Sequence, residues 1–253
     1  MSVSAIILAA GEGSRMKSDL PKPLHRVGDH SMLMHVVNAL ETVRPDTVVV
    51  VVGHRAEEVT QHVRDNTPPW ATVVFATQHQ QHGTGDAVSV GLSALDTREL
   101  ATTIIVLPGD TPLLTRETIS RLVSEHEQSA HAATVLISDV ADPTGYGRIV
   151  RMANGRVDRI VEHRDASPAE LQLSEINTGI YAFRADLLRP ALSKISTNNS
   201  QAEYYLTDVV AILTSAGHSV GAVLAPEEET AGVNDRDQLA AAELALHNRP
   251  HLT

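Results

Sequence analysis

Residues 5–16 read Ala-Ile-Ile-Leu-Ala-Ala-Gly-Glu-Gly-Ser-Arg-Met, and this stretch decides the fold. Its apolar half, residues 5–10, is nearly continuous, as expected of a strand that is buried on both faces of a parallel sheet. Its second half contains glycines, which let backbone N–H groups approach an anion without a Cβ in the way. Arg15, Lys17 and Lys22 add positive charge nearby. A strand that leads into such a loop indicates a phosphate site.

Two familiar phosphate loops do not fit this stretch. Met16 stands where a dinucleotide-binding fingerprint needs its third glycine, and no Gly-Lys-Ser/Thr triplet follows as in a P-loop. The loop therefore predicts a different phosphate cradle. Because glycine-rich turns after strands also occur without a ligand, the assignment depends on the rest of the chain.

Short β-branched runs alternate with stretches of helical period through the first half of the chain, which is typical of βαβ units. The strands predicted there are 5–10, 47–52, 73–76 and 103–107, and the helices are 31–43, 56–63, 85–95 and 116–127. Later elements are strands at 148–151, 156–161, 178–183 and 219–224, and helices at 185–194, 206–216 and 235–248, the last capped by Asp235. We expect an α/β fold with a Rossmann-like, mostly parallel sheet flanked by helices and a small β-rich elaboration.

The composition excludes several classes of protein. The 253 residues contain no cysteine, which excludes disulfides, thiolate zinc sites and cysteine nucleophiles and suits a cytoplasmic location. The net charge of −11 disfavours the broad basic surface that nucleic acid requires. No charged region precedes the first apolar run, and no run approaches the ~18 apolar residues of a membrane span, so we expect neither a signal peptide nor a membrane partner.

The loop from Leu8 to Met16, with Ser18 to His25 after it, resembles the signature of sugar-nucleotide pyrophosphorylases. Later motifs extend the resemblance over nearly the whole chain: Gln78 with Gly83-Thr84, Pro108-Gly109-Asp110, residues 142–149, Val161-Glu162-His163, residues 175–179, Tyr204 to Asp208, and Gly232-Val233-Asn234. The chain is most similar to the uridylyltransferase half of the bacterial bifunctional N-acetylglucosamine-1-phosphate uridylyltransferases / glucosamine-1-phosphate acetyltransferases.

That resemblance implies the nucleotide-diphospho-sugar transferase fold in a single domain, residues 1–253. The nucleotide-binding part would cover about residues 1–130, the sugar-binding part about 131–225, and a C-terminal helix about 235–248. Full-length relatives continue into a left-handed β-helix that carries the acetyltransferase and the trimer contacts. This sequence stops before any such repeat, so we expect no acetyl transfer and mostly monomer.

The implied reaction is Mg²⁺-dependent transfer of a uridylyl group from UTP to N-acetyl-α-D-glucosamine 1-phosphate, giving UDP-N-acetylglucosamine for peptidoglycan synthesis, and pyrophosphate. Joining two polyanions requires charge neutralisation and in-line positioning rather than a strong general base. Two alternatives stay open: another sugar-1-phosphate nucleotidyltransferase, or a catalytically silent regulator that binds nucleotide sugars.

The resemblance also implies the site residues. The catalytic candidates are Arg15 and Lys22, which match phosphate-contacting positions, and Asp110, which with Asn234 matches the Mg²⁺ ligands. The nucleotide is expected on Leu8, Ala9, Ala10, Gly11, Gln78, Gly83, Thr84 and Gly109. The sugar is expected on Gly147, Glu162 and Asn177.

Each of these roles has a structural alternative. Lys22 can be a solvated loop lysine, and Asp110 can cap the turn that follows it. Glu162 can form an ion pair with Arg148 or Arg164.

The base preference is the least determined feature. An amide such as that of Gln78 can flip to satisfy either uracil or cytosine, so selectivity must come from main-chain groups that cannot flip. The preference for UTP therefore rests mainly on the resemblance.

Overall fold

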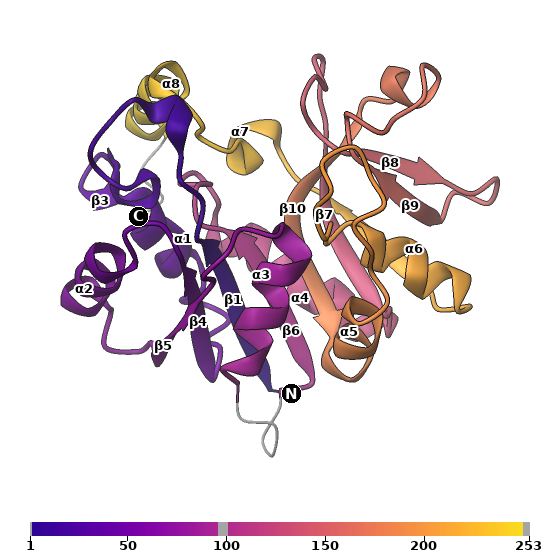
Figure 1. The fold of residues 1–253 in the computed structure, drawn as a ribbon, viewed down its shortest axis with the longest axis horizontal. Coiled ribbons are helices and arrows are strands. Elements are labelled where there is room, and N and C mark those ends of the chain that lie inside the picture. Colours follow the sequence, from indigo (N-terminus) through magenta and orange to yellow (C-terminus); the bar gives the residue numbers. More distant parts are fainter. Residues whose placement is uncertain (1, 96–100, 250–253) are drawn as a thin grey trace.

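A mixed sheet forms the centre of the computed structural model, which describes residues 2–95 and 101–249 (Figure 1). The strand order of its main path is β11-β7-β10-β6-β1-β4-β5. Strands β1, β4, β5 and β6 are parallel to one another, and only β10 runs against its neighbours on this path. The bounds are β1 Val3–Ala9, β4 Thr47–Val52, β5 Val73–Thr77, β6 Thr103–Pro108, β7 Ala133–Asp139, β10 Glu175–Arg184 and β11 Val220–Leu224.

A small β-rich addition extends from β10. Strands β8 (Arg148–Arg151) and β9 (Val157–Val161) form an antiparallel hairpin, which joins β10 where Ile176 lies opposite Arg148. A separate two-stranded sheet pairs β2 (Arg26–Val27) with β3 (His30–Ser31). The predicted fold class is confirmed.

Two strands of the main sheet differ markedly from the sequence analysis, which also does not predict the short strands β2 and β3. It does not predict β7, a short apolar run whose first six residues are buried, because periodicity cannot separate such a run from a piece of buried helix. The strand expected at 178–183 belongs to β10, which starts at Glu175 and lies in the main sheet between β6 and β7. It is therefore part of the scaffold as well as of the β-rich addition.

Helices cover both faces of the sheet. On one face lie α1 (Met32–Ala39), α2 (Ala56–Asn66) and α4 (Arg116–Ser129); on the other lie α3 (Thr84–Ser93), α5 (Ala185–Leu192) and α6 (Asp208–Ser215). Short helices η1 (Ser14–Met16), η2 (Lys22–Leu24), η3 (Glu170–Gln172) and α7 (Glu227–Thr230) complete the chain together with α8 (Arg236–Asn248). Within the described residues, no helix combines the length and the apolar character that crossing a membrane requires.

Helix α1 ends four residues before its expected end. The Ser31 hydroxyl accepts from the Met34 N–H and starts the helix. At the other end the Leu40 N–H donates to the Val37 carbonyl at 3.1 Å, three residues back instead of four, so the α-helical pattern ends at Ala39.

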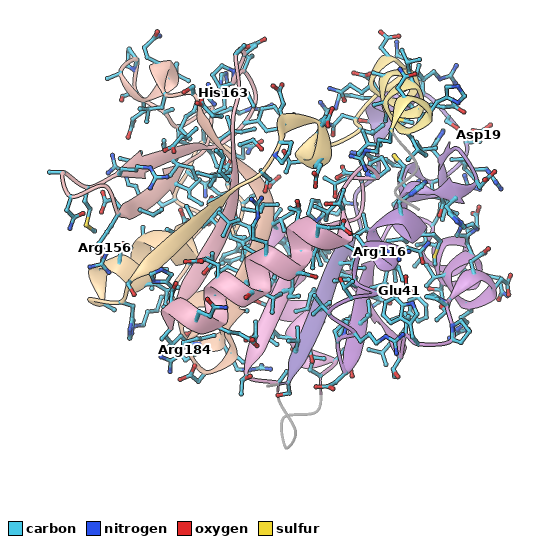
Figure 2. All side chains as sticks on the ribbon, turned by 180° about the vertical axis from the view of Figure 1, so that it is seen from behind. Asp19, Glu41, Arg116, Arg156, His163 and Arg184 are labelled. Atoms are coloured by element: carbon cyan, nitrogen blue, oxygen red, sulfur yellow. The ribbon has the colours of Figure 1, made fainter. Side chains whose placement is uncertain are left out.

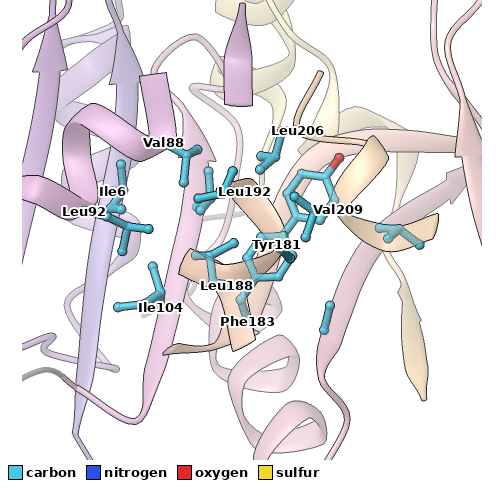
Figure 3. Packing of buried hydrophobic residues seen from close by; sticks show 14 of the residues in the cluster. Ile6, Val88, Leu92, Ile104, Tyr181, Phe183, Leu188, Leu192, Leu206 and Val209 are labelled. Carbon is cyan, nitrogen blue, oxygen red and sulfur yellow. The ribbon is translucent and has the colours of Figure 1, made fainter. Parts of the chain in front are cut away.

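The core on the α3 and α5 face is tightly packed (Figure 3). Ile6 of β1 lies against Leu92 of α3, and Tyr181 stacks on Phe183 along β10 with ring centroids 5.2 Å apart. Burial of each such side chain stabilises the fold by about 1.5–3 kcal/mol. The packed sheet thereby gives a rigid edge on which loops can hold a ligand.

Helix α8 attaches to the first loops of the chain. Its apolar side packs against Val27, Met32 and Leu113. Arg249, just after the helix, donates to the Leu113 carbonyl at 2.5 Å. The C-terminal helix therefore lies at the carboxyl edge of the sheet, beside the glycine-rich loop.

Elsewhere on the surface an ion pair of 2.6 Å joins Arg116 of α4 to Glu41, and both are labelled in Figure 2.

Candidate functional site

Four polar side chains from distant segments meet at the carboxyl edge of the sheet. The Lys22 Nζ donates to Asp110 Oδ2 at 2.5 Å and to Asn234 Oδ1 at 2.9 Å. Arg15 Nη2 donates to the same Asn234 oxygen at 2.9 Å. Asp110 follows β6, Lys22 opens η2, and Asn234 precedes α8. The fold brings together all the predicted catalytic and metal-binding residues, and Asp110 bonds to a lysine rather than only capping a turn.

Gly13 explains how Lys22 reaches this position. Its φ is 65°, a left-handed conformation that glycine adopts without a steric penalty. A Cβ at Gly13 would lie 2.4 Å from Lys22 Cβ, which is closer than any real contact. The loop thus needs glycine here so that the lysine stem can pass directly over its backbone.

The oxygens of Asp110 and Asn234 suit a divalent cation. Both contact one positive group, the Lys22 ammonium, and so share a cation between them. Mg²⁺ prefers oxygen ligands and keeps several of its waters, so two protein oxygens are a sufficient donor set. In the part of the chain that the structure describes, no three His, Asp or Glu side chains converge as metal ligands. The residues present therefore fit Mg²⁺ held by few protein donors, with Lys22 displaced.

The glycine-rich loop is held in place from the start of α8. Among residues 11–20 only Met16 is buried, so little apolar packing restrains the loop. Arg236 bridges the gap, because its Nε donates to the Met16 carbonyl at 3.1 Å and its Nη2 to the Lys17 carbonyl at 2.7 Å. Lys17 has a left-handed φ of 48°, which is unfavourable for a residue with a side chain. The sequence analysis does not identify Arg236, since only its position two residues after Asn234 connects it to the site.

A cavity of about 240 Å³ lies beside the loop. Its lining includes most of the predicted nucleotide-binding residues and three others, Gln81, Ala87 and Glu203: Leu8, Ala10, Gly11, Gln78, Gln81, Gly83, Thr84, Ala87 and Glu203. Two predicted residues do not line it. Ala9 belongs to the apolar cluster on the opposite face of the sheet, because neighbouring side chains of a strand alternate. Gly109 instead packs on β1, where its N–H donates to the Leu8 carbonyl at 2.9 Å.

The amide of Gln78 is held inside this cavity. Its Nε2 donates to Asp86 Oδ2 at 2.7 Å and to the Gly83 carbonyl at 3.2 Å. Across the cavity, Gln81 Nε2 donates to the Ala10 carbonyl at 2.8 Å. Asp86 and Gln81 are site residues that the sequence analysis does not identify. The sequence feature that could have identified them is their position within eight residues of Gln78 and close to Gly83-Thr84.

The predicted sugar-binding residues also lie together. The Asn177 N–H donates to the Gly147 carbonyl at 2.9 Å, and a Cβ at Gly147 would lie 3.5 Å from Glu162 Oε2. Glu162 accepts from the Thr207 hydroxyl at 2.9 Å. Within the described ranges Glu162 pairs with neither Arg148 nor Arg164, and Arg148 instead donates to the Tyr146 carbonyl.

The environment of Glu162 is unfavourable for a charge. Burial raises the pKa of its carboxyl, and the nearby Asp208 and Asp165 act in the same direction, while the Thr207 hydrogen bond opposes them. Such a carboxylate without a cationic partner is typical of a functional position.

Residues 204–207 connect the nucleotide cavity to the sugar side. The Tyr204 carbonyl accepts from the Gly85 N–H at 2.8 Å, and the Leu206 N–H donates to Thr84 Oγ1 at 3.1 Å. Thr207 then reaches Glu162. One short segment therefore contacts both parts of the site.

A larger cavity of about 560 Å³ lies at the opposite edge of the sheet, where β6 begins and β10 ends. His126, His131 and Arg184 contribute to its lining. None of the predicted site residues does so.

Known proteins resemble this chain over most of its length. The sequence model of the nucleotidyl transferase family matches residues 4–229. The bifunctional protein GlmU of Streptomyces avermitilis is 48% identical over 248 residues, which cover 97% of this chain and 51% of that protein. GlmU of Clostridium beijerinckii is 46% identical, covering 98% of this chain and 53% of the relative.

The chain thus spans about half the length of the curated relatives it matches. A solved structure reported as a glucose-1-phosphate thymidylyltransferase from Bacillus anthracis superposes with a TM-score of 0.75 over 100% of this chain and 98% of that one. Its sequence identity is 18%, so this likeness concerns the fold alone. The resemblance stated from the motifs is confirmed.

Proposed function

The chain belongs to the nucleotidyl transferase family, and from this premise we propose that it transfers a uridylyl group from UTP to N-acetyl-α-D-glucosamine 1-phosphate. A phosphate oxygen of the sugar phosphate forms a bond to the α-phosphorus of UTP. The bond between that phosphorus and the bridging oxygen breaks, and pyrophosphate leaves. The observation that carries the proposal is the meeting of Arg15, Lys22, Asp110 and Asn234 beside the glycine-rich loop.

The basic side chains would neutralise the triphosphate. Arg15 offers a planar set of donors and Lys22 a compact charge on a flexible stem, and both suit phosphate oxygens. Mg²⁺ held by Asp110 and Asn234 would supply further positive charge for the phosphates and the departing pyrophosphate. The Lys22 ammonium would then leave these two oxygens and turn to a phosphate. No general base is required, because the attacking oxygen is already negative near neutral pH.

The sugar would bind at the hairpin side of the site. Glu162 can accept from sugar hydroxyls or from the acetamido N–H, and the Asn177 amide can both donate and accept. Gly147 lets the ring approach the backbone. These roles are proposals that rest on the grouping of the three residues and on the similarity to the GlmU proteins.

The decisive experiment measures pyrophosphate release over a panel of nucleoside triphosphates and sugar 1-phosphates, with and without a chelator. We expect release from UTP with N-acetylglucosamine 1-phosphate, and its loss when the chelator removes Mg²⁺. A faster reaction with another pair would assign a different sugar nucleotide. Binding of UDP-sugars with no release from any pair would indicate a regulator instead.

Asp110 provides a sharper test of the metal site. Asp110→Asn removes the negative charge but keeps the shape, so we expect turnover to fall by about 10²–10³-fold and the Mg²⁺ requirement to rise. Initial rates over a range of Mg²⁺ concentrations measure both effects. Asp65→Asn, on α2, should match the wild type. A near-normal rate for Asp110→Asn at limiting Mg²⁺ would show that the ligand assignment is wrong.

Several wider features remain proposals. The continuous main sheet supports a single domain over residues 1–253, with the nucleotide-binding and sugar-binding parts sharing one scaffold. A cytoplasmic reaction that supplies a cell-wall precursor follows from the proposed chemistry. The expected monomer is tested by light scattering of the purified chain.

A further inference from the structure

We infer that Asp86 holds the amide of Gln78 in one orientation and so makes the base site select uracil over cytosine. The inference rests on the proposed function, because it concerns the base of the nucleotide donor. It assigns a positioning role to Asp86, a side chain at the start of α3.

The two hydrogens of the Gln78 amide are both used within the protein. Gln78 follows β5, its own N–H donates to the Val52 carbonyl at 2.8 Å, and the residue is only 6% exposed. Its Nε2 donates to Asp86 Oδ2 and to the Gly83 carbonyl. A carboxylate and a carbonyl can only accept, so both partners require the amide nitrogen.

A reversed amide would be unfavourable. It would place Oε1 against the Asp86 carboxylate and the Gly83 carbonyl, which breaks two hydrogen bonds and brings oxygens together. Asp86 lies in the first turn of α3, and its carboxylate accepts from the amide at 2.7 Å. The two acceptors together keep the amide in a single orientation.

The fixed orientation leaves Gln78 Oε1 for a ligand. Gln78 lines the 240 Å³ cavity, and Oε1 is not among the buried atoms without a partner. Within residues 2–95 and 101–249 no group donates to it. Nearby, the N–H groups of Gly83 and Thr84 donate to no described acceptor, since they lie at the N-terminus of α3. The cavity thus presents a fixed acceptor and, close by, unused main-chain donors.

This arrangement distinguishes the two pyrimidines. Uracil has a donor, N3–H, beside an acceptor, O4. These two groups complement the Gln78 Oε1 acceptor and a main-chain N–H donor of Gly83 or Thr84. Cytosine has the reverse order, an acceptor at N3 beside a donor at N4, so both of its contacts would be mismatched. A glutamine that could flip would accept either base, and Asp86 removes that freedom.

The test replaces the carboxylate by an amide of the same shape. In Asp86→Asn the new side chain can donate as well as accept, so only the more distant Gly83 carbonyl, at 3.2 Å, still opposes the reversed amide. We expect the ratio of kcat/KM for UTP to that for CTP to fall by about tenfold or more. The ratio of UMP to CMP affinity, measured by calorimetry without any turnover, should fall in parallel. Asp86→Glu, which keeps an acceptor-only carboxylate, should keep a higher ratio than Asp86→Asn.

A matched control is Asp186→Asn, the same substitution in the first turn of α5, which should leave both ratios unchanged. The inference is overturned if Asp86→Asn keeps the wild-type ratio of UMP to CMP affinity, or if it weakens both ligands equally. Thermal unfolding shows whether each variant is folded.

The two proposals can fail separately. An active transferase whose Asp86→Asn variant keeps its selectivity would refute only the role of Asp86. A chain without transfer activity that still distinguishes UMP from CMP through Asp86 would refute only the proposed reaction.

Discussion

Lys22 lies between two oxygens that suit a metal ion. Its side chain is 14% exposed and that of Asp110 is 26% exposed, so the carboxylate is partly shielded from water. A partly buried carboxylate without a partner would destabilise the fold, and the lysine compensates it. In the proposed reaction the same ammonium becomes available to the phosphates once Mg²⁺ takes its place. In that proposal one residue would thereby neutralise Asp110 in the free protein and a phosphate once the cation binds.

Glu162 offers a prediction about stability. Burial raises its pKa above the usual 4.5, so the folded state holds the proton more tightly than the unfolded state. The free energy of unfolding should therefore fall as pH rises from 4.5 through the raised pKa. Glu162→Gln removes this charge, and we expect it to be more stable than the wild type at neutral pH while binding the sugar phosphate less tightly. The difference in stability should disappear at about pH 4.

Urea unfolding at neutral pH and at about pH 4 measures the stability of Glu162→Gln relative to the wild type. Glu170 provides a control, because its substitution should change stability in the opposite direction. Hydrogen bonds from Ser167 and Arg159 lower the pKa of Glu170 to about 2. Its ionised form is thus favoured in the fold, and Glu170→Gln should lower stability at neutral pH. If both variants changed stability in the same direction, the burial argument for Glu162 would be wrong.

At the scale of elements, α8 contributes to the candidate site. Its first turn is capped by Asp235, whose carboxylate accepts from the Gln238 N–H at 2.9 Å. The residues beside this cap contact the glycine-rich loop: Asn234 bonds to Arg15, and Arg236 bonds to the carbonyls of Met16 and Lys17. A helix at the end of the described chain therefore restrains a loop near its beginning.

Arg236→Ala tests this restraint. Each lost hydrogen bond contributes about 0.5–1.5 kcal/mol, so we expect the KM for UTP to rise by about two- to tenfold, with a smaller change in kcat. Arg236→Lys should recover part of the loss because it keeps one donor. Steady-state kinetics over a range of UTP concentrations measures the changes in KM and in kcat separately. The cap and the apolar side of α8 are unchanged, so the helix should remain folded.

A matched control is Arg121→Ala. Arg121 of α4 donates to the Leu224 carbonyl at 2.7 Å and so joins two elements in the same manner, but at a distance from the loop. An equal rise in KM for both variants would mean that general destabilisation, rather than the loop contact, causes the effect.

At the scale of the whole molecule, a buried histidine predicts how stability depends on pH. His126 of α4 is 2% exposed, its Nδ1 lies 3.0 Å from Thr134 Oγ1, and burial lowers its pKa to about 4. Between about pH 6.5 and 4, His126 binds a proton in the unfolded chain but stays neutral in the folded chain. Stability is therefore present above pH 6.5 and declines on acidification, by an amount on the order of 3 kcal/mol from this residue.

His126→Gln should make the free energy of unfolding less dependent on pH across this window. Chemical denaturation at several pH values measures the slope. His218→Gln, at an exposed position, should keep the wild-type slope. An unchanged slope in His126→Gln would mean that other groups cause the acid sensitivity.

The sequence by itself determined the fold class and most of the elements. In the first half, apolar runs of strand length alternate with helical periods, and β1, β4, β5 and β6 lie within two residues of their predicted bounds. These patterns are local, because the order of apolar and polar side chains in consecutive residues indicates which face of a strand or helix is buried. Strand β7 was not predicted, because a short apolar run is compatible with a strand and with a piece of buried helix. The motifs also named the four polar residues that meet in the candidate site.

Only the tertiary structure decided how these residues combine. Lys22 and Asn234 lie 212 positions apart, and their contact follows from packing that no local pattern contains. The same holds for Arg236, which reaches Met16 across 220 positions. The orientation of an amide is likewise absent from a residue's identity, since it depends on which acceptor lies beside it. For Gln78 that acceptor is Asp86, and a contact between side chains, rather than the motif, sets the direction in which the amide points.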